Sequence, residues 1–95
     1  MKRIVWEETA LKVFEEAIAY LAAEDEHAAL RLEQRVSEAV ELLAHHSIGR
    51  PTRLQNVRQK IVLRTQYRIY HSITEAELFV IGIRHQRQDQ TRDDA

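Results

Sequence analysis

The residues best suited to chemistry follow the last hydrophobic run of the chain, in the segment IGIRHQRQDQ from Ile81 to Gln90. Arg84, His85 and Arg87 combine two guanidinium groups, which match phosphate oxygens, with an imidazole that can transfer protons near neutral pH. Such a set could bind and cleave a phosphodiester, or it could form the charged surface of a protein that binds another protein. The choice depends on which other side chains lie beside these three.

The charge of the chain is unevenly divided along its length. Residues 1–49 carry ten acidic and five basic side chains, a net −5, whereas residues 50–95 carry five acidic and nine basic side chains, a net +4. A basic half in a chain whose total charge is −1 is a candidate surface for an acidic partner. The alternative is that the helices of this chain carry Glu and its strands carry Arg, with no partner involved.

Two amphipathic helices are predicted in the first half of the chain. Apolar residues recur every three or four positions over residues 8–21, and again over residues 26–45. Asp25 stands between the two segments and is a candidate N-cap for the second helix. A joint this short predicts a helical hairpin. Gly49 and Pro51 then form a typical helix stop.

After Pro51 the hydrophobic period becomes two, which predicts strands. The segments VRQKIVLRT, YRIYHSI and ELFVIGIRH alternate apolar and polar residues, with short turns at residues 65–66 and 74–77. With the β-prone run KRIVWE before the first helix, the order predicts an α+β fold (β-α-α-β-β-β) that ends in a three-stranded antiparallel meander. We expect a single domain over residues 1–95, with residues from about 89 to 95 as a frayed polar tail.

Side chains alternate between the two faces of a strand, so their parity assigns them to a face. We expect one face to pack on the helices through these apolar residues: Val57, Ile61, Leu63, Ile69, Ile73, Phe79, Ile81 and Ile83. The opposite face then gathers five cations: Arg58, Lys60, Arg64, Arg68 and Arg84. Val62, Tyr70 and Val80 would lie among them. This face could hold phosphates or the acidic side chains of a protein, or it could be merely solvated.

The chain resembles toxins of the RelE/ParE superfamily, from bacterial type II toxin–antitoxin systems. The resemblance rests on four pieces in order: W..TAL..F..AIAYL, A..L...V..AVELLAHHSIGRP, NVRQKIVLRTQYRIYHSI and LFVIGIRHQRQ. It covers nearly the whole chain and implies the same order of strand, helical hairpin and antiparallel meander. It also implies a separate antitoxin protein that holds the toxin inactive.

The superfamily has two well-known branches that differ in mechanism. RelE-like members cleave mRNA in the ribosome, whereas ParE-like members inhibit DNA gyrase and carry out no nuclease chemistry. If this chain is RelE-like, the resemblance assigns its phosphate-holding groups to three basic residues: Lys60, Arg68 and Arg84.

Departures from the RelE-type site favour binding over catalysis. The second lysine of that site falls at Val62, the C-terminal tyrosine falls near Gln90, and no tyrosine follows Tyr70. Ribonuclease chemistry needs one group to take the 2′-hydroxyl proton and another to protonate the leaving oxygen. His85 is the only obvious substitute. We therefore predict a ParE-like gyrase inhibitor that is not an enzyme; the alternatives are a ribosome-dependent mRNA endonuclease and a toxin-derived interaction module without activity.

In the ParE-like reading, the charged residues form a surface that contacts the target: Arg58, Lys60, Arg64, Arg68, Arg84, His85 and Arg87. No metal or cofactor is expected, because the chain has no cysteine and the adjacent His45 and His46 are poorly placed to share an ion. The absence of cysteine is compatible with a reducing cytoplasm, and the N-terminus has no long apolar run. We expect a cytoplasmic protein that does not contact a membrane. Its expected partners are an antitoxin and DNA gyrase, or an antitoxin, the ribosome and mRNA in the alternative. The sequence does not determine the oligomeric state.

Overall fold

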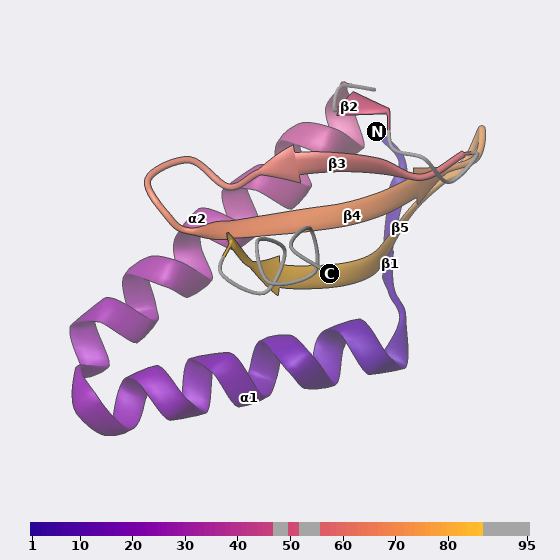
Figure 1. The fold of residues 1–95 in the computed structure, drawn as a ribbon. Coiled ribbons are helices and arrows are strands. Elements are labelled where there is room, and N and C mark those ends of the chain that lie inside the picture. Colours follow the sequence, from indigo (N-terminus) through magenta and orange to yellow (C-terminus); the bar gives the residue numbers. More distant parts are fainter. Residues whose placement is uncertain (47–49, 52–55, 87–95) are drawn as a thin grey trace.

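Within residues 1–46, 50–51 and 56–86, which the computed structural model describes, two helices pack on one face of a five-stranded sheet (Figure 1). The elements follow in the order β1 (Arg3–Trp6), α1 (Glu8–Glu24), α2 (Glu26–His45), β2 (Arg50–Pro51), β3 (Arg58–Ile61), β4 (Tyr67–Ile73) and β5 (Glu77–His85). The α+β class and the order of the main elements predicted from the sequence are confirmed. No helix in the described ranges is both long and apolar enough to cross a membrane.

The strands lie in the order β1-β5-β4-β3-β2, so the first and the last strand in sequence are neighbours in the sheet. β3, β4 and β5 form the predicted antiparallel meander, and β1 pairs in parallel with β5. The two-residue strand β2 was not predicted, because Pro51 was interpreted as a helix stop. A proline is tolerated there since β2 is an edge strand and needs few backbone donors. The predicted stop at Gly49 lies outside the described residues.

The helical hairpin turns at a single residue, Asp25. Its backbone N–H donates to the carbonyl of Leu21 at 2.8 Å and closes α1, while its carboxylate accepts from the N–H of Ala28 at 3.0 Å and caps α2. The predicted N-cap is confirmed, and a cap of this kind stabilises a helix by about 1 kcal/mol. The turn of the hairpin is therefore fixed by local hydrogen bonds that do not involve the sheet.

The core lies between α2 and the sheet. Its fully buried members come from three strands or strand ends and from α2: Val36, Leu43, Val62, Ile69, Leu78 and Val80. α1 packs on α2 and β5 at the margin of this core. The Phe14 ring there stacks on Trp6 of β1, with ring centroids 5.3 Å apart. Thus α2 is the central helix, and α1 covers the β1–β5 side of the sheet.

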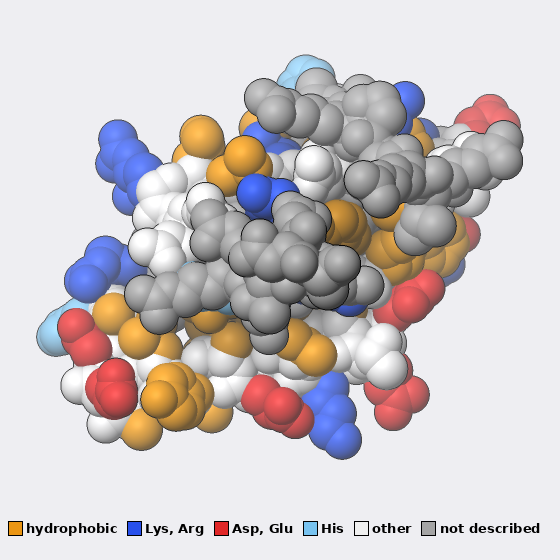
Figure 2. Space-filling view, in the orientation of Figure 1, with side chains coloured by type: hydrophobic (Ala, Val, Ile, Leu, Met, Phe, Trp, Pro, Cys, Tyr) orange, Lys and Arg blue, Asp and Glu red, His pale blue; other side chains and the backbone are white. Residues whose placement is uncertain are grey.

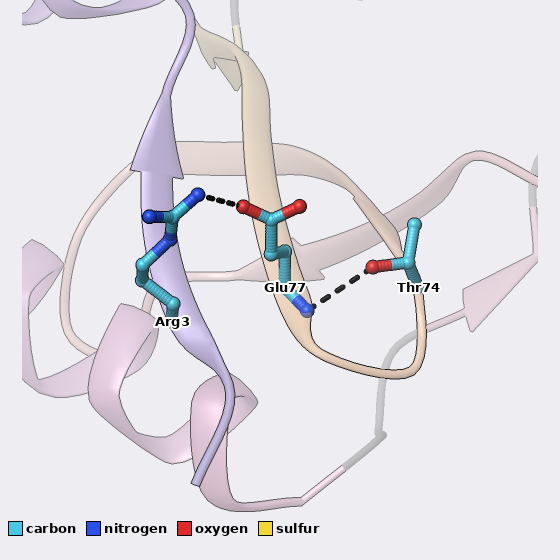
Figure 3. A network of polar contacts seen from close by, with 3 residues as sticks. All are labelled: Arg3, Thr74 and Glu77. Atoms are coloured by element: carbon cyan, nitrogen blue, oxygen red, sulfur yellow. Dashed lines mark hydrogen bonds and ion pairs between the residues drawn. The ribbon is translucent and has the colours of Figure 1, made fainter.

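Polar contacts fix β1 against the start of β5 (Figure 3). The guanidinium of Arg3 forms an ion pair with Glu77, whose backbone N–H donates to the hydroxyl of Thr74 at 3.1 Å. The ammonium of Lys2 donates to the carbonyls of Thr74 and Glu75, at 2.6 and 2.9 Å. These contacts hold the β4–β5 turn and set the parallel register of β1 and β5.

The face assignment predicted for β3 is wrong. Val62 is fully buried and packs in the core, whereas Ile61 and Leu63 are 48% and 70% exposed. Lys60 lies directly opposite the fully buried Ile69, so its side chain leaves the sheet on the helix side. A shift of one residue moves every side chain of a strand to the opposite face. Ile61, Val62 and Leu63 are consecutive apolar residues, so the sequence alone did not determine which of them faces the helices.

The register of β3 also changes the face of Arg58, and a bulge in β5 changes the faces of Phe79 and Val80. Arg58 lies opposite the buried His71, so it belongs to the helix side, contrary to prediction. In β5, Tyr70 pairs with Gly82 and His71 pairs with Val80, so Ile81 is the extra residue of a β-bulge. The bulge turns Leu78 and Val80 into the core and moves Phe79 to the opposite face. Ile69, Ile73 and Ile83 lie on the helix side as predicted.

Candidate target-binding surface

Arg68 and Arg84 are directly opposite each other on neighbouring strands, and both side chains leave the sheet on the face away from the helices. Each arginine is adjacent in sequence to an isoleucine that points into the core, Ile69 and Ile83 respectively, so alternation places the arginines on the other side. Both side chains are partly exposed. Like charges directly opposite each other repel, so the pair favours contact with anionic groups. We call this side of the sheet the distal face; the prediction that it carries Arg68 and Arg84 is confirmed.

Tyr70 adds an aromatic side chain to the distal face, two residues beyond Arg68. It lies opposite Gly82, and a Cβ atom built on Gly82 would lie 3.6 Å from the Tyr70 Cβ and 3.8 Å from its Cδ2. The tyrosine side chain therefore leans over the glycine, which leaves the ring room on the sheet surface. Tyrosine and arginine are, with tryptophan, the residue types enriched among strongly contributing interface contacts. The predicted position of Tyr70 among the cations holds, but Val62 and Val80 are in the core.

The other predicted cations do not join this pair. Arg58 and Lys60 lie on the helix side of the sheet. Arg64 lies in the β3–β4 turn with a φ of 63°, a left-handed conformation that is uncommon outside glycine. The backbone bonds that join Val62 to Thr65 and Tyr67 close this turn. The five-cation surface expected from the sequence is therefore divided between two faces and a turn.

His85 ends β5 opposite Tyr67, on the helix side of the sheet as its parity predicted. The two rings meet edge to face, with centroids 5.1 Å apart. The contact fixes the histidine ring against the start of β4, close to Arg68 and Arg84 in sequence but on the other side of the strands. This placement is typical of a strand-end packing residue. Arg87, also predicted to contact the target, lies outside the described residues.

The acidic and basic side chains, which lie mostly in different halves of the sequence, also lie on different parts of the surface. Figure 2 shows mostly acidic side chains along α1, at the lower edge of the view, and basic side chains beside hydrophobic ones near the β3–β4 turn at the left. A cationic sheet and an anionic helical hairpin can bind different parts of a partner. The described residues hold no cluster of three potential metal-ligating side chains. The basic side chains of the sheet are suited to recognising anionic groups.

Comparison with known families decides which protein class this is. The family model for the ParE toxin of type II toxin–antitoxin systems, parDE, matches residues 4–90. The chain belongs to this family. A Sinorhizobium fredii (strain NBRC 101917 / NGR234) protein named "Putative toxin Y4kP" is 33% identical to it over 91 residues, which cover 94% of this chain and 95% of that protein.

Solved structures agree with this ParE-family assignment at the level of the fold. A chain of the chromosomal ParDE toxin–antitoxin system from P. aeruginosa superimposes with a TM-score of 0.79 at 19% identity, covering 90% of this chain and 96% of that one. The isolated E. coli RelE toxin superimposes with a TM-score of 0.58 at 15% identity, covering 99% and 98%. The membership in the RelE/ParE superfamily predicted from the sequence is confirmed, on the ParE side.

Proposed function

We propose that this ParE-family toxin arrests growth by binding DNA gyrase and that it has no catalytic activity of its own. The observation that carries the proposal is the register of β3. It puts Lys60 on the helix side of the sheet, while Arg68 and Arg84 project from the distal face. In the neutralised state an antitoxin holds the toxin, as the toxin–antitoxin family implies.

This register argues against a RelE-type nuclease site. Such a site needs Lys60, Arg68 and Arg84 to converge on one scissile phosphate. Side chains from opposite faces of one sheet cannot do so without a change of register. Among the residues that the structure describes, proton transfer also has no suitable pair of groups, because Val62 is buried where a second lysine would be needed and His85 packs on Tyr67. The Arg68–Arg84 pair with Tyr70 requires only an anionic protein surface to bind.

The test compares both activities with the same purified toxin. We expect inhibition of gyrase-catalysed DNA supercoiling in a titration, and intact mRNA in a translation extract at the same toxin concentrations. Codon-biased mRNA cleavage with unaffected supercoiling would replace this proposal with the RelE-like endonuclease. If the toxin neither inhibits supercoiling nor cleaves mRNA, the protein is a toxin-derived interaction module without activity.

The variant His85→Ala separates a binding protein from an enzyme. We expect it to weaken gyrase inhibition by less than about tenfold, because it removes an edge-to-face ring contact and no reacting group. Loss of an essential general base would instead reduce a cleavage rate by about 10²–10⁴-fold. His85→Phe keeps an aromatic ring against Tyr67 and is the matched control. If His85→Ala and His85→Phe both abolish toxicity while the protein stays folded, the imidazole is required and the binding reading is wrong.

A further inference from the structure

The β3–β4 turn, residues 62–66, carries residues that its backbone conformation does not favour. The N–H of Thr65 donates to the carbonyl of Val62 at 3.2 Å and closes a β-turn. Leu63 and Arg64 take its two central positions, and of the two only Arg64 has a positive φ, 63°. This is the pattern of a type II turn, which favours proline at the first central position and glycine or asparagine at the second. An arginine in the left-handed region destabilises the turn relative to glycine, so the requirements of folding do not explain its presence.

Both central side chains of the turn are exposed to solvent. Leu63 is 70% exposed, and Arg64 is also exposed and has no ion-pair partner among the described residues. Leu63 is not isolated, because Ile61, two residues earlier, is 48% exposed. The core position between them is filled by Val62, so neither exposed side chain is needed for packing. Residues that depart from local rules in an otherwise consistent fold are expected at functional sites.

Hydrogen bonds hold the turn in one conformation at the end of the sheet (Figure 1). The hydroxyl of Thr65 donates to the carbonyl of Val62 at 2.8 Å and accepts from the N–H of Tyr67 at 3.1 Å. The N–H of Val62 donates to the carbonyl of Tyr67 at 3.0 Å. From the end of β5, the N–H of Gln86 donates to the carbonyl of Gln66 at 2.6 Å. Because a segment fixed in this way loses little conformational entropy on binding, the turn is preorganised for contact.

The turn continues the candidate target-binding surface at one end. Ile61 pairs with Arg68, and Arg68 pairs with Arg84, so the three form a row across β3, β4 and β5 on the distal face. Leu63 and Arg64 follow within three residues of Ile61, and they add a second apolar side chain and a third cation. A complementary protein surface would have an apolar cleft bordered by carboxylates.

We propose that the β3–β4 turn inserts into the protein that the toxin attacks, with Leu63 in an apolar cleft and Arg64 against a carboxylate at the edge of that cleft. The partner is a protein and not a nucleic acid, because an exposed leucine gains nothing from contact with phosphates. The left-handed backbone at Arg64 sets the direction in which the two side chains leave the turn. Only the identity of the target as DNA gyrase rests on the proposed function.

Leu63→Ala tests the apolar contact, both in cells that lack the antitoxin and with purified toxin. We expect the toxin dose that halves growth, and the concentration that half-inhibits supercoiling, to rise by about tenfold or more, since an apolar anchor is truncated. Leu30→Ala is the matched control, because Leu30 is 58% exposed on α2, and both values should stay within about threefold. Both leucines are exposed, so neither replacement opens a cavity in the core.

Arg64→Gly separates target contact from folding. Glycine relaxes the left-handed backbone, so the Tm should rise by about 2–8 °C. Loss of the guanidinium should nevertheless raise both half-inhibitory values by about tenfold. Arg64→Asn also tolerates this backbone, without the flexibility of glycine, and should lose the same activity. Arg31→Ala removes an exposed cation of α2, and its values should stay within about threefold.

The results that contradict this inference differ from those that contradict the proposed function. If the wild-type toxin inhibits supercoiling and the Leu63 and Arg64 variants inhibit it equally well, the turn is not a contact and the proposed function stands. If the wild-type toxin arrests growth and leaves supercoiling intact, gyrase is not the target. The role of the turn then stands if its variants lose growth arrest, and is wrong if they keep it.

Two further outcomes would also overturn the role of the turn. Variants that keep full toxicity but escape neutralisation by the co-expressed antitoxin would assign the turn to the antitoxin contact. An Arg64→Gly toxin that is more stable and fully active would show that the turn only joins β3 and β4. Circular dichroism confirms that each purified variant is folded.

Discussion

Replacing Arg68 and Arg84 together by glutamate should raise the toxin concentration that half-inhibits gyrase supercoiling by about 100-fold or more. Arg68 and Arg84 are paired on neighbouring strands, and Tyr70 projects from the same face, so an acidic patch that binds this face would meet two carboxylates in the variant. Removing a central, desolvated charge contact costs about 2–5 kcal/mol, and reversing the charge adds repulsion. The half-inhibitory concentration in a supercoiling titration measures this directly.

The matched control carries the same change in net charge elsewhere. Lys12→Glu with Arg31→Glu places both reversals on exposed positions of the helices. We expect its half-inhibitory concentration to stay within about threefold of the wild-type value. If both double variants lose activity equally, long-range attraction explains binding and the distal face has no special role. If neither does, the target contacts another surface of the toxin.

Leu43→Ala should lower the free energy of unfolding by about 3 kcal/mol, a large share of the total stability of a small domain. Leu43 is 1% exposed and lies in the cluster that α2 forms with the sheet, so truncation leaves a cavity that this packing cannot fully close. For a domain of this size the loss corresponds to a fall in Tm of roughly 12–24 °C. Urea unfolding followed by circular dichroism gives the free energy.

Leu30→Ala is the control, because it makes the same substitution on the same helix at a side chain that is 58% exposed. We expect a change within about 0.5 kcal/mol. A similar loss in both variants would mean that the effect does not depend on the burial of Leu43. Helix propensity slightly favours alanine over leucine and cannot account for a loss. A negligible loss in Leu43→Ala would mean that α2 is not the central helix of the core.

The sequence by itself determined the elements whose signals are local. The period of 3.6 located both helices, and Asp25 marked their joint because a carboxylate can satisfy the free N–H groups at a helix start. The period of two located β4 and β5 with the bounds seen in the structure. Arg68 and Arg84 were assigned to the correct face because each is adjacent to an isoleucine, Ile69 or Ile83, that had to face the core. The arginines therefore had to face the other way.

Tertiary structure alone decided the pairings between distant segments and the faces that follow from them. The parallel pairing of β1 with β5 joins residues more than 70 positions apart, and no local pattern encodes it. The bulge at Ile81 reversed the faces of Phe79 and Val80, because one inserted residue is invisible in an unbroken apolar run. The face of Lys60 was equally undetermined by sequence. Val62 entered the core in place of Ile61 and Leu63, and this register of β3 placed the lysine on the helix side of the sheet instead of the distal face.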